Sequence, residues 1–549
     1  MYEVSRRQAM FTLGALAFVV AGCGSEDAPP NTEELAEQLA DKRVGAMDNF
    51  TVGTQFKATQ ELTFDILYNN HSFYPIKKNW LFWSELTKRT NVKLNPEVVP
   101  LSDYENKRSL IIGAGDAPPI IPKTYPGQED PFVSSGAILP VSDYLDLMPH
   151  FQDKIRKWNL HADIDTLRQA DGRFYLLPGV HENIWIDYSL AVRTDILDEL
   201  GLEIPKTWDE LHTVLKAMKD KYPNIYPFSD RWGVPTPGGA LLNILGQAYG
   251  TSGGWGYQHA YWDAKAQRFV YTGAMDEYRQ MLEYLHTLVK EKLMDPESFT
   301  QQDETAIQKF TSGKSFVICT NAQTLVNELR PPLEKLNPDA RVVKIPPPLG
   351  PAGNVKVGTR LENGIMISSK AAESEHFVAM MQFIDWLWYS DEGQEFAKWG
   401  VEGVTYEKTP DGKYKLADDV DFVGLNPGAK KHLQQDFGFS NGVFAYGGST
   451  QLLQSTFSEE ELEFQKVVNA RETVPVPPPH PFNDAEREQA TLWETPLKDY
   501  VTQQTLRFIL GERDLSEWDD YVKELEGKNM NAYIDLVNSA YERYKKEHG

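Results

Sequence analysis

The fold of this chain is decided by the stretch Leu62-Thr63-Phe64-Asp65-Ile66-Leu67-Tyr68, where apolar and polar side chains alternate. Alternation of this kind predicts a β-strand with one buried face. Residues 80–90 then predict a helix, Val92-Lys93-Leu94 a second strand and residues 104–112 a second helix. Pro119-Ile120-Ile121-Pro122 is suited to a short buried strand. The order strand, helix, strand, helix, strand is typical of an α/β layer, which is the fold class we expect.

Helices dominate the rest of the chain. Thr207 suits the N-cap of one of them, and Glu210 stands three residues later, as in a capping box. Residues 377–389 carry an apolar stripe at helical spacing, which favours a place in the core over a binding surface. Two proline-rich segments, at 346–348 and 475–479, predict rigid extended connectors. Helices are expected at residues 208–219, 275–291, 377–389, 500–510, 518–524 and 529–545.

The amino terminus predicts an exported lipoprotein. Arg6-Arg7 precedes a short apolar run over residues 10–20. A basic start, an apolar centre and small residues before a cleavage point are the parts of a secretory signal. Val20-Ala21-Gly22-Cys23 also resembles the bacterial lipobox, so we expect residues 1–22 to be a signal peptide and Cys23 to carry lipid. An uncleaved N-terminal anchor is the alternative, and export by Sec or by Tat stays open.

The charge balance excludes several classes of partner. The 549 residues include 55 Lys and Arg against 79 Asp and Glu, a net charge of −24. Nucleic acid and anionic lipid both select clustered positive charge, so we expect no nucleic acid partner and little electrostatic adhesion to a membrane. Lipid on Cys23 would supply most of the membrane attachment. Cys319 would then have no partner for an internal disulfide, and a large core must supply the stability.

The segment after the signal is expected to be a tether. Residues 23–57 begin with small, acidic and proline residues, a composition that disfavours packing, so we expect a flexible tether there. No second apolar stretch in the sequence is long enough to cross a membrane, and the body of the mature protein is expected to be soluble.

Motifs for common enzyme chemistries are missing from the sequence. Gly313-Lys314-Ser315 matches the end of a phosphate-binding loop, but Gln308 stands where that loop needs glycine. The sequence has no His-Glu-x-x-His, and its two cysteines are far apart. Gly250-Thr251-Ser252-Gly253-Gly254 has the spacing of Gly-x-Ser-x-Gly, but it follows no clear strand, which a nucleophile elbow requires, and it lacks the glycine spacing of a dinucleotide-binding loop. We therefore assign no catalytic residue, no metal and no cofactor. Counting does not exclude a pair of glycosidase carboxylates, because carboxylates are abundant.

One segment carries a specific family signature. Leu197-Asp198-Glu199-Leu200-Gly201, followed by Pro205-Lys206-Thr207-Trp208-Asp209-Glu210-Leu211, resembles the central signature of extracellular solute-binding proteins of family one. These proteins are the carbohydrate receptors of ABC importers. Shorter matches lie at residues 109–121, 136–141 and 171–178, and those at 90–94 and 400–406 resemble the branch that includes alginate-oligosaccharide-binding proteins.

The resemblance implies an α/β fold of two lobes, of the periplasmic-binding-protein type II class, with hinge crossovers and C-terminal helices. Lobe one would comprise residues 58–184 with 358–430, and lobe two residues 190–350 with C-terminal helices at 431–549. The alginate receptors carry an EF-hand-like calcium loop where this chain has residues 220–227. That segment lacks alternating oxygen ligands and a closing carboxylate, so we expect no calcium there.

The function implied is that of a lipid-anchored receptor outside the cytoplasm, at the periplasm or cell surface. Closure of the two lobes would capture an oligosaccharide, and the membrane subunits of an ABC importer would then recognise the closed form. We expect a monomer without enzymatic activity. Two alternatives are a receptor for a non-sugar solute such as a peptide and a lipid-anchored glycan hydrolase.

Ligand-binding residues are expected in loops at strand ends, which face the cleft in folds of this kind. The abundance of Trp and Tyr suits sugar binding, because sugar rings stack their C–H faces on aromatic planes. For each aromatic residue, packing in the hinge or core is the alternative, and for residues 69–74 a solvated turn. The candidates are Asn69, Asn70, His71, Tyr74, Trp185, Tyr188, Arg231, Trp232, Trp255, Tyr257, Asn321, Gln323, Arg360, Glu362, Asn363 and Tyr446, with Phe444 as a weaker one.

Overall fold

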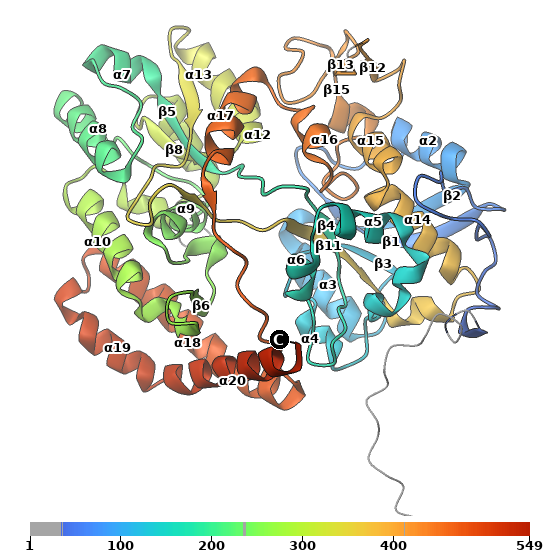
Figure 1. The fold of residues 1–549 in the computed structure, drawn as a ribbon. Coiled ribbons are helices and arrows are strands. Elements are labelled where there is room, and N and C mark those ends of the chain that lie inside the picture. Colours follow the sequence, from blue (N-terminus) through green and yellow to red (C-terminus); the bar gives the residue numbers. More distant parts are fainter. Residues whose placement is uncertain (1–34, 36, 234–235, 237, 411, 549) are drawn as a thin grey trace, which may run out of the picture.

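The computed structural model describes the chain except for residues 1–34, 36, 234–235, 237, 411 and 549. The predicted signal peptide and Cys23 lie outside the described residues. Figure 1 shows two α/β lobes side by side, each with its own apolar core, so the expected two-lobe fold is confirmed. Three segments, called the crossovers below, run between the secondary structure of the two lobes: residues 181–188, 346–360 and 455–483.

Lobe one is built on a five-stranded sheet with the strand order β2-β1-β3-β11-β4. β1 pairs in parallel with β2 and β3, and all nine of its residues have partners in β2. This long register carries β2 well beyond the predicted strand at 92–94. β11 returns from lobe two and runs antiparallel between β3 and β4. The bounds are Leu62–Asn70 for β1, Val92–Pro100 for β2, Ile120–Thr124 for β3, Leu177–Val180 for β4 and Leu361–Ile367 for β11.

The core of lobe one surrounds helix α14, whose residues are all buried. The sequence predicted one buried stripe, but the helix is covered on every side, as its almost wholly apolar sequence requires. Phe383 of α14 contacts Phe64 of β1 with ring centroids 6.0 Å apart. The helices of this lobe include α2 (Leu81–Thr90), α3 (Tyr104–Gly113), α5 (Pro149–Lys157), α6 (His161–Asp165), α14 (Phe377–Tyr389) and α15 (Asp391–Trp399).

Two segments pack in lobe one where the sequence suggested otherwise. Phe56 is fully buried in the first core, and Gln382 makes hydrogen bonds of 2.9 and 3.0 Å to the backbone of Met47. Residues 44–57 therefore contact the lobe, which differs from the flexible tether expected over 23–57. Leu433 and Phe439 are also in the first core, although the expected division assigned 431–549 to lobe two. Their apolar side chains are buried beside those of α2 and α14.

Lobe two has a three-stranded sheet with the order β8-β5-β9 and a shell of helices. The capping box before α8 is confirmed, because Glu210 N–H donates to Thr207 Oγ1 (3.1 Å) and Thr207 N–H donates to Glu210 Oε2 (3.3 Å). The bounds are Ser189–Arg193 for β5, Val317–Thr320 for β8, Val342–Ile345 for β9, Trp208–Lys221 for α8, Gly239–Tyr249 for α9, Asp276–Lys290 for α10 and Asp303–Thr311 for α11.

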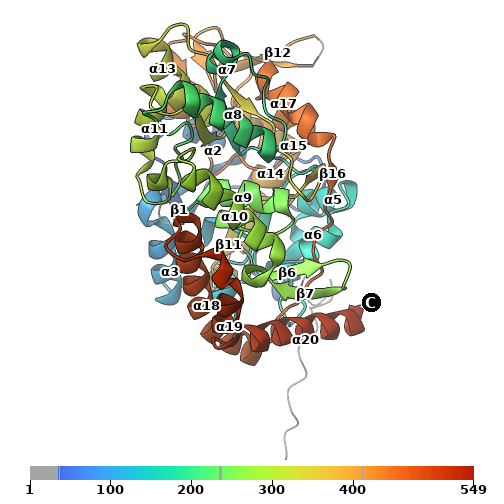
Figure 2. The ribbon, with the colours of Figure 1, turned by 90° about the vertical axis from the view of Figure 1, so that its left-hand side faces the viewer.

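The C-terminal helices extend lobe two. Figure 2 shows α18, α19 and α20 along its base, and Leu497, Phe508 and Val537 lie in the second core. The first of these helices is longer than predicted because it begins at a capping box made by Asn483 and Glu486. Among the described residues, none of the helices combines the length and hydropathy that a membrane span requires. The bounds are Asp484–Leu510 for α18, Trp518–Glu526 for α19 and Met530–His548 for α20.

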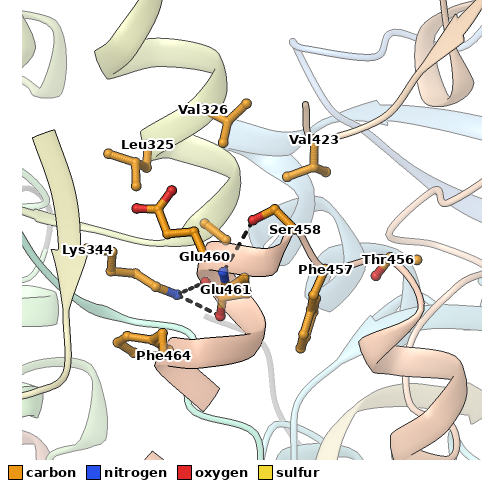
Figure 3. Close-up of a pocket in the computed structure, with 11 residues that line it drawn as sticks. Leu325, Val326, Lys344, Val423, Thr456, Phe457, Ser458, Glu460, Glu461 and Phe464 are labelled. Carbon is orange, nitrogen blue, oxygen red and sulfur yellow. Dashed lines mark hydrogen bonds and ion pairs between the residues drawn. The ribbon is translucent and has the colours of Figure 1, made fainter. Parts of the chain in front are cut away.

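A buried ammonium group of lobe two contacts the first and the third crossover, and Figure 3 shows its pairing with the third. Lys344, at the end of β9, places its Nζ 2.9 and 2.7 Å from the carboxylate oxygens of Glu461, which belongs to α17 (Glu459–Asn469) in the third crossover. The same Nζ donates to the backbone carbonyl of Asp187 in the first crossover (3.0 Å) and lies 3.6 Å from Oδ1 of that residue. Phe464 covers it with its ring, 3.9 Å away. Lys344 and Glu461 are each 5% exposed, so the pair is shielded from water.

Lys344→Met is expected to destabilise the protein strongly, because it leaves the carboxylates of Glu461 and Asp187 buried without a cation. Breaking a buried ion pair on one side costs about 3–5 kcal/mol. The measurement is the midpoint of thermal unfolding. Lys335→Met removes an exposed lysine of the same lobe and should leave the midpoint unchanged. Equal melting of the two variants would contradict the role assigned to Lys344.

Candidate functional site

One edge of the lobe-one sheet collects polar residues from four strands. β1 and β3 run in parallel and end at this edge, while β11 begins there and β4 ends there. In sheets of this kind the ligand site lies beyond the carboxyl ends of the strands. The side chains so placed include the predicted Asn69, Asn70, Glu362 and Asn363, together with Lys123, Tyr125 and His181, which the sequence reasoning did not name.

Glu362 is the centre of this polar edge. Its carboxylate lies 2.7 Å from His181 Nε2 and accepts hydrogen bonds from the Asn363 side chain (3.1 Å) and the Gly447 amide (3.2 Å). Burial by itself would raise the pKa of Glu362, but the bond to His181 and the positive charges of His181, Lys123 and Lys398 lower that pKa to about 2. Glu362 is therefore an ionised hydrogen-bond acceptor at any physiological pH.

Several buried polar atoms beside Glu362 have no hydrogen-bond partner among the described residues. They are Nδ1 of His181, Nε1 of Trp185, Oδ1 of Asn363 and Oη of Tyr446. The ring of Trp185 is 5.9 Å from that of His181. Buried polar groups nearly always have partners in folded proteins, supplied by protein, by water or by a ligand. Three residues predicted from the sequence, Trp185, Asn363 and Tyr446, thus meet around a fourth, Glu362.

Lobe two contributes a cluster of three aromatic rings, called the aromatic triad below. The ring centroids of Tyr188, Trp232 and Trp255 lie 5.4, 5.4 and 5.2 Å apart. Trp255 is 44% exposed, an unusual exposure for so large an apolar side chain. The Arg231 guanidinium lies over the Trp232 ring at 4.3 Å and pairs with Asp303 and Glu328. The exposed ring and the polar rim suit a ligand with both apolar and hydroxyl surfaces.

Glycine brings Trp255 close to the start of α9. A Cβ on Gly239 would stand 2.4 Å from Trp255 Nε1, and a Cβ on Gly254 would stand 2.1 Å from the Gly239 carbonyl oxygen. Gly254 also has φ of +54°, in the left-handed region that other residues avoid. The glycine-rich run at residues 250–256 therefore positions the ring of Trp255.

The polar edge and the aromatic triad face each other between the lobes. Burial raises the pKa of Tyr188, and the charges of Asp187, Tyr125 and Glu362 add to that rise, so a lobe-two ring is within electrostatic reach of two lobe-one groups. Tyr125 follows β3 directly and is 46% exposed. Ligand-binding residues are expected in loops that follow strands, and Tyr125 lies in the loop after the strand predicted at residues 119–122. The sequence could therefore have identified Tyr125.

Other predicted residues lie near the same region. His71 and Tyr74 stack with centroids 4.5 Å apart and an interplanar angle of 4°. The Asn70 side chain accepts a hydrogen bond from the Ile76 amide (2.8 Å), which fixes the turn after β1. Asn321 caps α12 (Ala322–Thr324), where it accepts a bond from the Thr324 amide (2.8 Å), and Gln323 lies in that short helix, half-buried.

Three predicted residues have packing partners away from the triad. Arg360 pairs with Asp163 and donates to the Trp158 carbonyl (2.7 Å). Tyr257 is packed against the second core, with its ring 6.2 Å from that of Tyr278. Phe444, 2% exposed, stacks on Phe82 at 4.6 Å in the first core. Within the described part of the chain, no three His, Cys, Asp or Glu side chains gather as a metal ion would need.

Comparison with known proteins places this arrangement among binding proteins. The family model of bacterial extracellular solute-binding protein matches residues 74–395. The fructooligosaccharide ABC transporter substrate-binding protein FusA of Streptococcus pneumoniae serotype 4 is 23% identical over 571 residues, 99% of each chain. Lipoprotein LipO of Bacillus subtilis is 22% identical and covers 84% of this chain and 88% of its own. The crystal structure of the alginate-binding protein AlgQ2 without calcium ion has a TM-score of 0.68 at 21% identity, over 89% of this chain and 99% of that one.

Glu362→Gln is expected to lower stability in a way that depends on pH. The folded pKa of about 2 lies below the ordinary 4.5, so the ionised carboxylate stabilises the fold above pH 4.5, and this contribution is lost as the pH falls toward 2. At pH 7 the variant should be less stable by about 2–3 kcal/mol. Denaturant titrations at several pH values measure this difference, which should shrink below pH 4.5.

The control for that titration is Glu97→Gln, which changes an exposed carboxylate on β2 and should match the wild type throughout. A difference between Glu362→Gln and the wild type that stays constant from pH 7 to pH 2.5 would contradict the low pKa.

Proposed function

The chain belongs to the bacterial extracellular solute-binding proteins, and we propose that it is an ABC importer's receptor that captures an oligosaccharide between its two lobes. FusA supports the proposal, since that relative matches the chain from end to end and its name states a fructooligosaccharide ligand. The family and the relatives are binding proteins rather than enzymes.

The observation that carries the proposal is the aromatic triad opposite Glu362. A sugar ring offers C–H faces that pack on the exposed Trp255 and Tyr188, and hydroxyl groups around its edge. The ionised carboxylate of Glu362 accepts hydrogen bonds from such hydroxyls, and the unpartnered Trp185 and Tyr446 donors can bond to sugar oxygens. Each of these bonds contributes about 0.5–1.5 kcal/mol net.

Ligand capture would work through closure. The triad belongs to lobe two and Glu362 to lobe one, so a sugar that contacts both groups binds the closed arrangement more tightly than an open one. The closed population then rises with ligand concentration, and the importer's membrane subunits would recognise that form. The three crossovers are where the backbone would bend.

Membrane attachment would come from lipid on Cys23. The lipobox-like residues 20–23 support this, as does the name of the relative LipO. The net charge of −24 disfavours adhesion to anionic lipid, so the acyl chains would supply the attachment. We place the protein outside the cytoplasm, as a monomer on the outer face of the membrane that holds its importer.

Cys23→Ser is expected to release the protein from the membrane, because no acyl chain can then be attached. In bacteria fed a labelled fatty acid, the wild type should carry label and enter the detergent phase of a Triton X-114 extract, and the variant should do neither. Cys319→Ser, at the buried second cysteine, should behave like the wild type. Label that persists in Cys23→Ser would overturn the lipid site.

The ligand class is tested by calorimetry with fructo-oligosaccharides, alginate and galacturonate oligomers, and peptides. We expect micromolar or tighter binding of one glycan class, with the glycan recovered at its original length after incubation. Binding of a peptide alone would favour the peptide receptor, and shortened glycan would favour the hydrolase; either result would contradict the proposal.

Trp255→Ala is expected to weaken binding of that glycan about thirtyfold, since a central aromatic contact contributes about 2 kcal/mol. Its melting temperature should be nearly unchanged, because the ring is half exposed. Trp518→Ala provides the opposite control, as this buried ring packs against Phe508 and Tyr521 at the base of lobe two. It should lower the melting temperature and leave affinity intact. The reverse pattern would place Trp255 in the core.

A further inference from the structure

A cavity of about 410 Å³ lies between the lobes, beside the aromatic triad. Lobe one lines it with the loop that leads into α4 (Asp130–Val133) and with residues 166–169. Lobe two lines it from the hairpin of β6 (Ala260–Asp263) and β7 (Arg268–Tyr271), and from α18 and α20. The proline-rich part of the third crossover, residues 477–481, forms a further wall. Its volume is within the 300–1,000 Å³ typical of small-molecule sites.

The cavity and the proposed sugar site are adjacent along the chain on both lobes. Pro126 lines the cavity and directly follows Tyr125, which lies opposite Tyr188. Gln258 lines it as well, three residues after Trp255 of the triad. One ligand of sufficient length can therefore occupy the triad and the cavity together.

The cavity has the contacts of a built site. Glu129 is 1% exposed, and its Oε2 has no hydrogen-bond partner among the described residues. The next residue, Asp130, pairs through Oδ2 with Arg487 of α18 (2.9 Å). Gln169 donates a hydrogen bond to Asp130 Oδ1 (2.7 Å) and accepts one from Arg487. These bonds join lobe one to the C-terminal helices. A buried carboxyl oxygen without a partner is a site for a hydroxyl group, which can both donate and accept a hydrogen bond.

Ion pairs and burial reduce the net charge around the cavity. Asp130 pairs with Arg487, and Arg168 pairs with Asp165 at 2.8 Å. Burial, with the neighbouring Asp130, raises the pKa of Glu129 to about 8, so most of this carboxyl is protonated at pH 7. Burial lowers the pKa of His259 to about 4 and lowers that of His480, so both rings are neutral. Burial also raises the pKa of Glu494. A charged ligand group would therefore meet mostly paired charges, and burial would penalise it.

We propose that this cavity is an end subsite for an uncharged, hydroxyl-bearing sugar unit of an oligosaccharide whose other units lie on the aromatic triad. The proposal rests on the proposed function and adds the length and the terminal chemistry of the ligand. Proline rings, Phe482 and Tyr533 would pack on the sugar's C–H surface, and Glu129 would bond to a hydroxyl. Affinity should then rise with chain length until the cavity is occupied.

The test fills the cavity with a tryptophan side chain introduced on α18. Thr491 is exposed and lines the cavity, so Thr491→Trp fills it without disturbing the core. Leu492→Trp adds the same ring to the next residue, which is 65% exposed and does not line the cavity, and it is the matched control. The probes are sucrose, kestose and nystose, which add one neutral sugar unit at a time, and galacturonate oligomers of the same lengths. Affinities are measured by calorimetry with the full mature chain.

We expect wild type and Leu492→Trp to bind the longest neutral probe at least tenfold more tightly than the shortest, and Thr491→Trp to lose that gain while binding the shortest probe normally. A Thr491→Trp protein that keeps the gain, or that loses affinity equally for all lengths, would overturn the end subsite and leave sugar binding itself intact. A gain for galacturonate oligomers alone would overturn the uncharged terminus. Absence of all sugar binding in the wild type would refute the proposed function as well.

Discussion

The buried ion pair between Lys344 and Glu461 is the interaction on which the arrangement of the lobes depends. Lys344 lies two residues before the second crossover, Glu461 lies in the third and Asp187 in the first. Inside a protein, a lone ammonium would be costly, so each carboxylate has to remain near Lys344. The three chain segments are thereby joined at one point although they are far apart in sequence.

The same interaction positions the proposed site. Asp187 accepts a hydrogen bond from the Ala322 amide (3.2 Å) and immediately precedes Tyr188, while Asn321 precedes Ala322. Tyr188 of the aromatic triad is therefore one peptide bond away from Asp187, which contacts the buried Lys344. Glu362, on the opposite lobe, is held by His181 at the start of the first crossover. His181 begins the first crossover and Tyr188 ends it, so each wall of the site is connected to that crossover. Closure would then move each wall as a unit.

The two walls differ in chemistry, and the difference suits one class of ligand. Lobe one presents a carboxylate held ionised by His181, Lys123 and Lys398, and lobe two presents rings with Arg231 at their edge. Neither wall alone covers a sugar ring, which needs stacking on its faces and hydrogen bonds around its edge. The cavity beside Glu129 continues this pairing of polar and apolar surface toward the C-terminal helices.

Much of the fold could be predicted because local patterns dominate it. The alternating strand at 62–68, the capping box at Thr207 and the apolar helix at 377–389 each depend on residues close in sequence, and the structure confirms them. The site could be predicted only in part. Trp255 and Tyr188 pack together and Glu362 lies at the polar edge of lobe one, but nothing local distinguishes them from Phe444, whose ring is buried on Phe82.

The sequence by itself determined the strand and helix order and the strand ends from which a binding site is built, because periodicity, capping and turn residues act over a few positions. The two-lobe class was implied by the family signature at residues 197–211. Only the tertiary structure decided which side chains face one another. Residues 44–57 and Leu433 join the first core, Lys344 meets Glu461 across more than a hundred residues, and Tyr125 comes to lie opposite Tyr188. These pairings depend on burial and on charges brought together by the whole chain, which no local pattern records.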